Sequence, residues 1–175
     1  MRRCLLALLA LVTLVACQSR YITFSLEKDG VLYNYSEMIT FYYPREWNLT
    51  KDELKLSLDI VNEKEKEVLY FDAFDVEESN THQELMALYE AKLKDVGVSV
   101  LEEQEALLES GQKCFYLTGE IPKNEALFCE VVVFVGNKQY IYSYIADAEV
   151  YVDNQETMLN YLKSLVVNEV MKTAL

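Results

Sequence analysis

Two kinds of hydrophobic periodicity divide the chain into strands and helices. Residues 54–60 alternate strictly between apolar and polar side chains, which predicts a half-buried strand. Residues 68–76 are apolar on both faces, which favours a central strand covered from both sides. Further strands are predicted at residues 21–26, 31–35, 38–44, 98–110, 113–121, 127–135 and 139–146.

Turn-forming residues join these strands. Asp29-Gly30 predicts a hairpin between residues 21–26 and 31–35, and Pro44 ends the strand that follows. Most later strands are also joined by short turns, so the sheet should be mostly antiparallel.

Two segments have helical periodicity. Thr81 and Glu84 fit a capping box, and Gly97 suits the end of the helix that it begins. The apolar stripe expected on this helix consists of Leu85, Leu88, Tyr89, Leu93 and Val96. A second helix is predicted after a cap at residues 153–156, with a buried stripe of Met158, Leu159, Leu162, Leu165 and Val166.

The order of these elements predicts an α+β fold. A mostly antiparallel β-sheet with helices on both faces would form a three-layer α/β/α sandwich. No repeat or linker divides the chain after its first residues, and its length suits one domain. We therefore assign residues 1–16 to a signal peptide, 17–20 to a lipidated cysteine and short tether, and 21–175 to a single domain.

The first residues have the pattern of an export signal. Arg2 and Arg3 precede an uncharged apolar run that ends at Ala16. This run is too short for a membrane span, which needs about 20 apolar residues. The run ends in Leu-Val-Ala-Cys at residues 14–17, which resembles the lipobox of bacterial lipoproteins.

The lipobox resemblance implies cleavage between Ala16 and Cys17 and a lipid attached to the Cys17 thiol. An ordinary secretory signal or an uncleaved anchor is the alternative. The lipid would hold the domain on the outer face of the cell membrane in a monoderm bacterium. In a diderm, Gln18 in place of an aspartate points to the outer membrane, facing the periplasm.

The charge of the chain limits its partners. Lys and Arg number 16 against 29 Asp and Glu, for a formal net charge of −13, and residues 1–16 hold two of the cations and no acid. This charge argues against binding to nucleic acid and against electrostatic docking on anionic lipid. It weakly favours cationic partners or divalent ions, although acidity also serves solubility.

Two cysteines remain in the domain, Cys114 and Cys129, on either side of a predicted hairpin. A disulfide between them is one alternative in an oxidising envelope, and two buried free thiols are the other. A turn near residues 123–124 would place Cys114 opposite about residue 133 rather than Cys129, which favours free thiols.

Three segments together resemble a known family. They are ITFYYPREW at 39–47, SGQKCFYLTGE at 110–120, and GNKQYIYSYIA at 136–146, the last followed by a helix ending YLKSLVV. In pattern and order they are similar to the PsbP-like family, which includes the photosystem II subunit PsbP, a nuclear Ran-binding relative and bacterial DcrB-type proteins. The resemblance covers about residues 31–168 and implies the fold and a non-enzymatic accessory or binding role. A cystatin-like or NTF2-like sheet domain is the competing fold.

Motifs for catalysis or metal binding are absent from the sequence. His82 is the single histidine, no zinc, phosphate-loop or dinucleotide pattern occurs, and no cofactor is implied. Asp147, Glu149 and Asp153 could in principle hold calcium, but helix capping and solubility explain them better. The tyrosine row Tyr140, Tyr142 and Tyr144, with Tyr42, Tyr43 and Trp47, could line a cleft or simply pack under the helices.

We therefore expect a non-catalytic, lipid-anchored envelope lipoprotein that binds a protein partner or assists assembly. Capture of a small ligand or divalent cation is the alternative. A hydrolase that uses paired carboxylates is the third.

Overall fold

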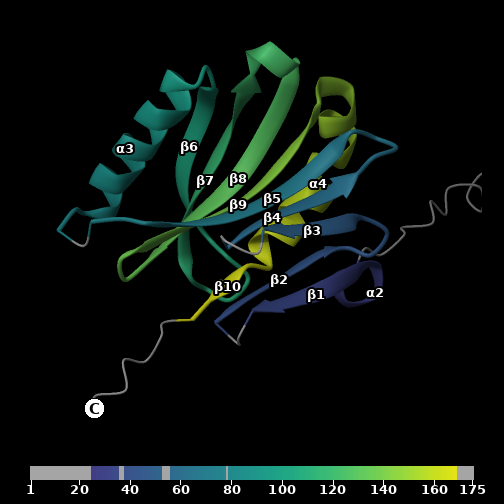
Figure 1. Ribbon diagram of the computed structural model, residues 1–175, viewed down its shortest axis with the longest axis horizontal. Coiled ribbons are helices and arrows are strands. Elements are labelled where there is room, and N and C mark those ends of the chain that lie inside the picture. Colours follow the sequence, from purple (N-terminus) through teal and green to yellow (C-terminus); the bar gives the residue numbers. More distant parts are fainter. Residues whose placement is uncertain (1–24, 36–37, 53–55, 78, 169–175) are drawn as a thin grey trace, which may run out of the picture.

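The computed structural model describes residues 25–35, 38–52, 56–77 and 79–168, which form two sheets and three α-helices (Figure 1). The helices are α2 (Leu26–Asp29), α3 (His82–Asp95) and α4 (Ala148–Lys163), with a 3-10 turn at Pro122–Asn124. The strands are β1 (Gly30–Tyr35), β2 (Ile39–Pro44), β3 (Asn48–Asp52), β4 (Ser57–Asn62), β5 (Glu67–Asp75), β6 (Ser99–Leu107), β7 (Lys113–Ile121), β8 (Ala126–Val135), β9 (Lys138–Asp147) and β10 (Val166–Val167). No helix in these ranges is long and apolar enough to cross a bilayer.

Antiparallel pairing dominates both sheets. The larger sheet has seven strands in the order β3-β4-β5-β9-β8-β7-β6, and the smaller has the order β1-β2-β10. Every pair of neighbouring strands is antiparallel. The prediction of a mixed α+β fold with a mostly antiparallel sheet is therefore confirmed.

The two faces of the larger sheet carry separate hydrophobic clusters, because side chains alternate along each strand. On β8, Val131 and Val133 belong to the cluster that contains Tyr161 and Leu162 of α4 and Phe41 of β2. Val132 and Phe134 of the same strand belong to the cluster that contains Leu85 and Met86 of α3. The smaller sheet and α4 thus pack against the same face of the larger sheet. The sequence did not predict this second sheet.

β6 forms one edge of the larger sheet and is its most polar long strand. A register shift between Val100 and Glu102 interrupts its pairing with β7. Glu102, Glu103 and Glu105 are all exposed on this strand. A strand was predicted at residues 98–110, and β6 confirms it over Ser99–Leu107.

The predicted Asp29-Gly30 hairpin is wrong within the described residues. The Ser25 carbonyl accepts hydrogen bonds from the amides of Lys28 and Asp29, and Asp29 Oδ2 accepts one from the Ser25 amide at 2.9 Å. These bonds close the helical turn α2 instead of a hairpin. β1 then begins at Gly30 and pairs with β2. Residues 21–24 lie outside the described residues.

The start of α4 was also placed too late. The helix begins at Ala148, so Asp153 and Asn154 lie inside it rather than at its cap. The polar side chain of Asn154 makes a tertiary contact instead: its Nδ2 donates to Glu67 Oε1 at 2.8 Å. The sequence alone does not distinguish an asparagine that caps a helix from one that makes a tertiary hydrogen bond.

Candidate functional site

Helix α3 is positioned by its first turn. The Thr81 side chain accepts from the Glu84 amide at 3.3 Å, and Glu84 Oε2 accepts from the Thr81 amide at 2.7 Å, so the predicted capping box is confirmed. This fixes His82 at the start of the helix. Its ring stacks on Phe134 of β8, with centroids 5.2 Å apart and planes at 27°.

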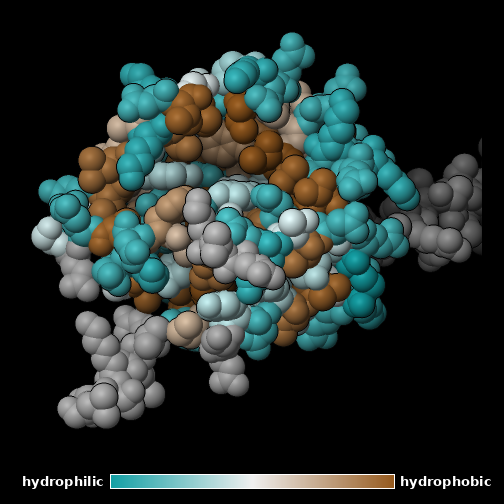
Figure 2. Space-filling model, in the orientation of Figure 1, coloured by the Kyte–Doolittle hydropathy of each residue, from teal (hydrophilic) through white to brown (hydrophobic). Residues whose placement is uncertain are grey.

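The predicted stripe on α3 is only partly correct. Leu85 and Met86 are buried, and Tyr89 packs partly buried on the same cluster. Leu88 and Val96 remain 53% and 75% exposed. Val96 is the C-cap residue, one position past the end of α3. Figure 2 shows apolar side chains breaking the polar surface over α3.

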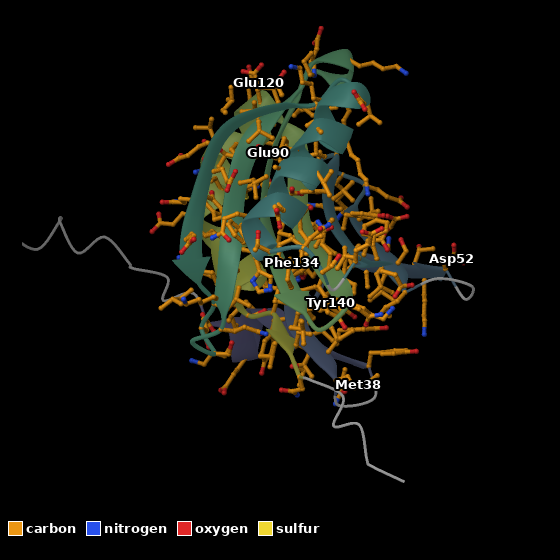
Figure 3. All side chains as sticks on the ribbon, turned by 90° about the vertical axis from the view of Figure 1, so that its left-hand side faces the viewer. Met38, Asp52, Glu90, Glu120, Phe134 and Tyr140 are labelled. Carbon is orange, nitrogen blue, oxygen red and sulfur yellow. The ribbon has the colours of Figure 1, made fainter. Side chains whose placement is uncertain are left out.

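A pocket of about 610 Å³ opens beside the first turn of α3. Its apolar floor is formed by Phe115 of β7 and by Val132 and Phe134 of β8. The Phe115 and Phe134 rings meet edge to face, with centroids 6.1 Å apart. Figure 3 views the molecule from this side, with Glu90 on α3 and Phe134 below it.

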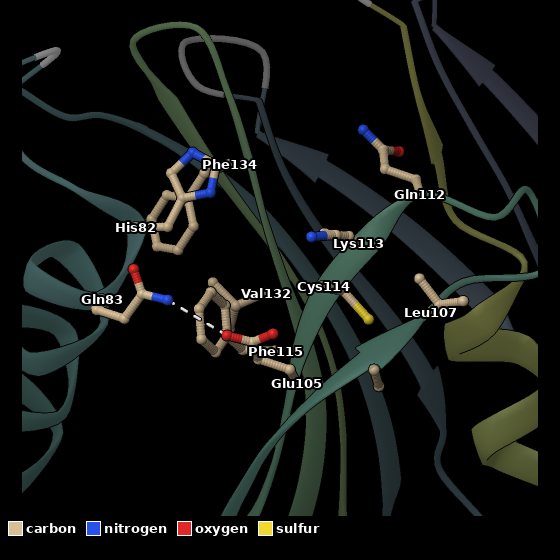
Figure 4. A pocket seen from close by; sticks show the side chains of 11 residues that line it. His82, Gln83, Glu105, Leu107, Gln112, Lys113, Cys114, Phe115, Val132 and Phe134 are labelled. Atoms are coloured by element: carbon tan, nitrogen blue, oxygen red, sulfur yellow. Dashed lines mark hydrogen bonds between the residues drawn. The ribbon is translucent and has the colours of Figure 1, made fainter.

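Polar side chains form the rim of the pocket (Figure 4). Gln83 Nε2 of α3 donates to Glu105 Oε1 of β6 at 3.2 Å, which closes one side. Lys113 lines the pocket from the start of β7. The ion pairs found among the described residues are Lys66–Asp147 and Lys138–Asp75. Lys113 therefore forms no ion pair with any described acidic residue.

A buried carboxylate lies deeper under the same helix. Tyr70, Ser143 and Glu130 stand opposite one another on β5, β9 and β8, and therefore share one face of the sheet. Glu130 is only 4% exposed. Ser143 Oγ donates to Glu130 Oε2 at 2.7 Å, and Tyr89 of α3 is the second hydrogen-bonding neighbour.

Burial raises the pKa of Glu130 to about 7, because the apolar interior disfavours the charged form. The hydrogen bonds from Ser143 and Tyr89 oppose this rise without cancelling it. Oε1 of Glu130 has no partner of normal hydrogen-bond geometry within the described residues. Glu130 is thus a proton-binding group whose charge changes near neutral pH.

Two further carboxylates form hydrogen bonds near α3: Glu103 of β6 and Asp72 of β5. Burial, followed by a hydrogen bond with Glu90 of the helix, raises the pKa of Glu103 on β6. Tyr70 donates to Asp72, and burial together with this carboxylate raises the pKa of Tyr70 to about 12. The helix therefore rests on a sheet face that is rich in carboxylates.

The opposite face holds a second buried carboxylate, Glu67. Tyr144 donates to its Oε1 at 2.7 Å, and Asn62 donates to its Oε2 at 2.8 Å. Asn154 of α4 adds the third bond described above. Glu67 is the first residue of β5 and directly follows the exposed charged residues 63–66, and nothing local in the sequence distinguishes it from the acids among them.

Cys17 and Ala16, the predicted lipidation and cleavage residues, lie outside the described residues. Cys114 and Cys129 are both buried and free. Cys129 lies opposite Thr118, away from Cys114. Burial raises the pKa of Cys114 to about 11 and that of Cys129 to about 12, which keeps both thiols protonated and unreactive.

The tyrosine row does not line a cleft. Tyr142 and Tyr144 are fully buried, and Tyr140 is nearly so. Tyr142 donates to the Tyr42 carbonyl at 2.9 Å, while the Tyr144 ring stacks on Tyr151 of α4. The partly buried Tyr42, Tyr43 and Trp47 pack against the same core cluster. The row therefore packs the interface between the sheet and its cover.

The acids near α4 do not assemble into a site. Asp147 pairs with Lys66 at 3.4 Å, while Glu149 and Asp153 are exposed. Within the described ranges, no three His, Cys, Asp or Glu side chains come together as metal ligands.

The pocket was missed from sequence. The position of His82 in a helix cap predicts a solvent-facing side chain, and His82 is exposed, although its ring also stacks on Phe134. Its contact with Phe134 depends on where α3 crosses β8, and no local pattern encodes that crossing.

Comparison with known proteins finds a shared fold but no close relative. No protein family and no curated protein matches the chain in sequence. Its structure is similar to the cyanobacterial PsbP (CyanoP) from Synechocystis, with TM-score 0.64, 12% identity and coverage of 87% of this chain and 99% of that one. It is also similar to PA94 from Pseudomonas aeruginosa, described as a putative regulator, with TM-score 0.56, 10% identity and coverage of 81% and 99%. A third likeness is to the Saccharomyces cerevisiae Ran-binding protein Mog1p, with TM-score 0.51, 9% identity and coverage of 79% and 95%. These likenesses support the PsbP-like fold of the chain.

Proposed function

We propose that this chain is a non-catalytic, lipid-anchored domain of the bacterial cell envelope that binds a protein partner. Leu85 and Met86 of α3 belong to one hydrophobic cluster, while Tyr161 and Leu162 of α4 belong to the other, together with Phe41 of the small sheet. The lipid on Cys17 supplies the membrane attachment, and the folded domain supplies the contact.

The observation that carries the proposal is the Leu-Val-Ala-Cys sequence at residues 14–17, which resembles a lipobox and lies ahead of a folded domain. Residues 18–24 separate Cys17 from Ser25, the first described residue. A chain of that length reaches at most roughly 28 Å when extended. The membrane therefore stays close to α2, and a lipid with two or more chains makes the attachment stable.

The partner surface is best sought at the opposite end of the molecule. In Figure 1, α2 lies at the right and α3 with β6 at the left. The α3 end carries the pocket and the exposed Leu88. Mog1p, which shares the fold, is described as a Ran-binding protein, so this fold supports protein recognition elsewhere.

The anchor is tested by two matched cysteine substitutions. Cys17→Ala should abolish labelling by a clickable palmitate analogue and release the chain from membranes. Cys4→Ala alters the same leader without touching the lipobox and should leave both properties intact. Retention and labelling of the Cys17→Ala chain would disprove the anchor.

The partner role is tested by site-specific photo-crosslinking in the native host. A crosslinker at Leu88 on α3 should give a discrete protein adduct. The same group at Lys28 on α2, also exposed, should not. Adducts that form only at Lys28, or at neither position, would contradict the proposed surface.

Small-ligand capture is the second candidate function. The pocket beside α3 is the observation that favours it, since about 610 Å³ lies within the range of small-molecule sites.

A further inference from the structure

We propose that the pocket beside α3 binds a small organic carboxylate with a flat apolar or aromatic body. The inference stands independently of the lipid anchor and of the protein partner, because it rests on the lining of the pocket alone. Three features of that lining carry it: an aromatic floor, one ammonium group that forms no ion pair within the described residues, and a helix start that is already capped.

The floor suits a flat apolar group. Phe115 and Phe134 present an edge-to-face pair whose planes differ by 76°, and Val132 lies on the same floor. All three are buried side chains on strands inside the sheet, so the surface is held rigidly. Aromatic rings pack well against such pairs at centroid distances of about 4.5–7 Å. His82, stacked on Phe134, extends this aromatic wall to the rim.

The charge of the rim selects an anion. Glu105 is the one acid in the lining and accepts the Gln83 amide, so its carboxylate is held toward α3. Lys113 forms no ion pair within the described residues and lies beside the open centre in Figure 4. An ammonium group offers three donors to an oxygen ligand. A carboxylate on the bound molecule would supply the missing partner.

A phosphate is a poorer fit than a carboxylate. Helix starts bind phosphate through free amides and the helix dipole. At the start of α3, the Glu84 amide is bonded to the Thr81 side chain, and the Glu84 carboxylate adds a negative charge to the first turn. Lys113 is then the single cationic side chain that is free to face the ligand.

The test titrates the full chain, purified in a mild detergent, with 3-phenylpropionate. Binding is measured by ligand-observed NMR, and detergent alone is the blank. Saturable binding is expected. Weaker binding is expected for 3-phenylpropan-1-ol, which lacks the charge, and for acetate, which lacks the body.

Two lysine substitutions locate the site. Lys113→Gln should raise the Kd for 3-phenylpropionate about threefold, which lies within the loss expected for an exposed charge pair. Lys123→Gln makes the same charge change after the other end of β7 and should leave the Kd unchanged. Both lysines are exposed, so neither variant should alter the circular dichroism spectrum of the fold.

Phe134→Leu, which keeps much of the volume but removes the ring, should also weaken binding. Three results would overturn the proposal: no saturable binding, equal binding of the alcohol and the acid, or an unchanged Kd in Lys113→Gln. A thermal melt of each variant separates loss of the site from loss of the fold.

Discussion

Ser143 Oγ donates a 2.7 Å hydrogen bond to the Glu130 carboxylate inside the seven-stranded sheet, beneath α3. The pair joins β9 to β8 at the centre of the fold. A hydroxyl is a weak substitute for water around a charged carboxylate, so the folded state binds a proton here more tightly than the unfolded chain does. Stability must therefore depend on the protonation of Glu130.

The first prediction concerns pH. The pKa of Glu130 rises from 4.5 to about 7 on folding, so its contribution is complete below pH 4.5 and is lost as the pH rises to about 7. The loss of unfolding free energy is at most about 3.5 kcal/mol, because each unit of pKa shift corresponds to about 1.4 kcal/mol. The free energy of unfolding of Glu130→Gln, measured with urea, should lack this loss. The difference in stability between the variant and the wild type should therefore shift in favour of the variant as the pH rises from 5 to 8.

The control for this experiment is Glu120→Gln, an exposed position on the neighbouring strand β7. It removes one negative charge without altering the buried cluster. Parallel pH profiles for Glu130→Gln and wild type would contradict the assignment, whatever the absolute stability of the variant.

The second prediction concerns the cap of α3. Thr81→Ala removes the hydroxyl that bonds the Glu84 amide and should cost about 1 kcal/mol of unfolding free energy. Thr81→Ser keeps the hydroxyl and should cost much less. Urea denaturation at pH 7 measures both, and equal losses for the two variants would show that the methyl group matters rather than the cap.

The third prediction concerns close packing between β6, β7 and β8. A Cβ added at Gly119 would clash with the Ser99 carbonyl oxygen and lie within 2.7 Å of the Phe128 ring. Gly119→Ala should therefore destabilise the fold by about 2 kcal/mol or more. Gly111→Ala has open space and only a positive φ of 81° to oppose it, so its cost should be nearer 1 kcal/mol. The reverse order of unfolding midpoints would refute the clash.

The fourth prediction concerns Glu67 on the opposite face. Tyr144→Phe removes a 2.7 Å donor from this buried carboxylate and should cost about 2 kcal/mol. Tyr140→Phe, on the same face of β9, removes a hydroxyl that forms no hydrogen bond within the described residues and should cost less. Chemical denaturation of both variants checks the difference, and equal costs would remove the special role of Tyr144.

Local sequence patterns predicted the strands, helices and caps more reliably than the pairing and packing of those elements. The alternation that buries Leu58 and Ile60, and the capping box at Thr81, depend on neighbours within a few residues, and both are present. The turn near residues 123–124 also fixed the β7–β8 register, so Cys129 is offset from Cys114 as expected. Such features depend on short-range sterics and hydrogen bonds.

Contacts between distant segments could not be predicted in the same way. β5 pairs with β9, and β10 joins β2, across long stretches of chain. Which flank of α3 is buried depends on how the helix lies across β8, so Leu88 was predicted inside and is exposed. The pocket depends on the same crossing, as does the burial of Glu130.

The polar character of β6 affects how copies of this chain can associate. An open strand edge is a template for pairing with another chain, and bulges and charged side chains prevent that pairing. β6 has both, in the shift between Val100 and Glu102 and in its exposed glutamates. Under the proposed lipid anchor, the chains would share a plane and meet their own copies far more often than in solution. The like charges along β6 would then keep those copies from pairing edge to edge.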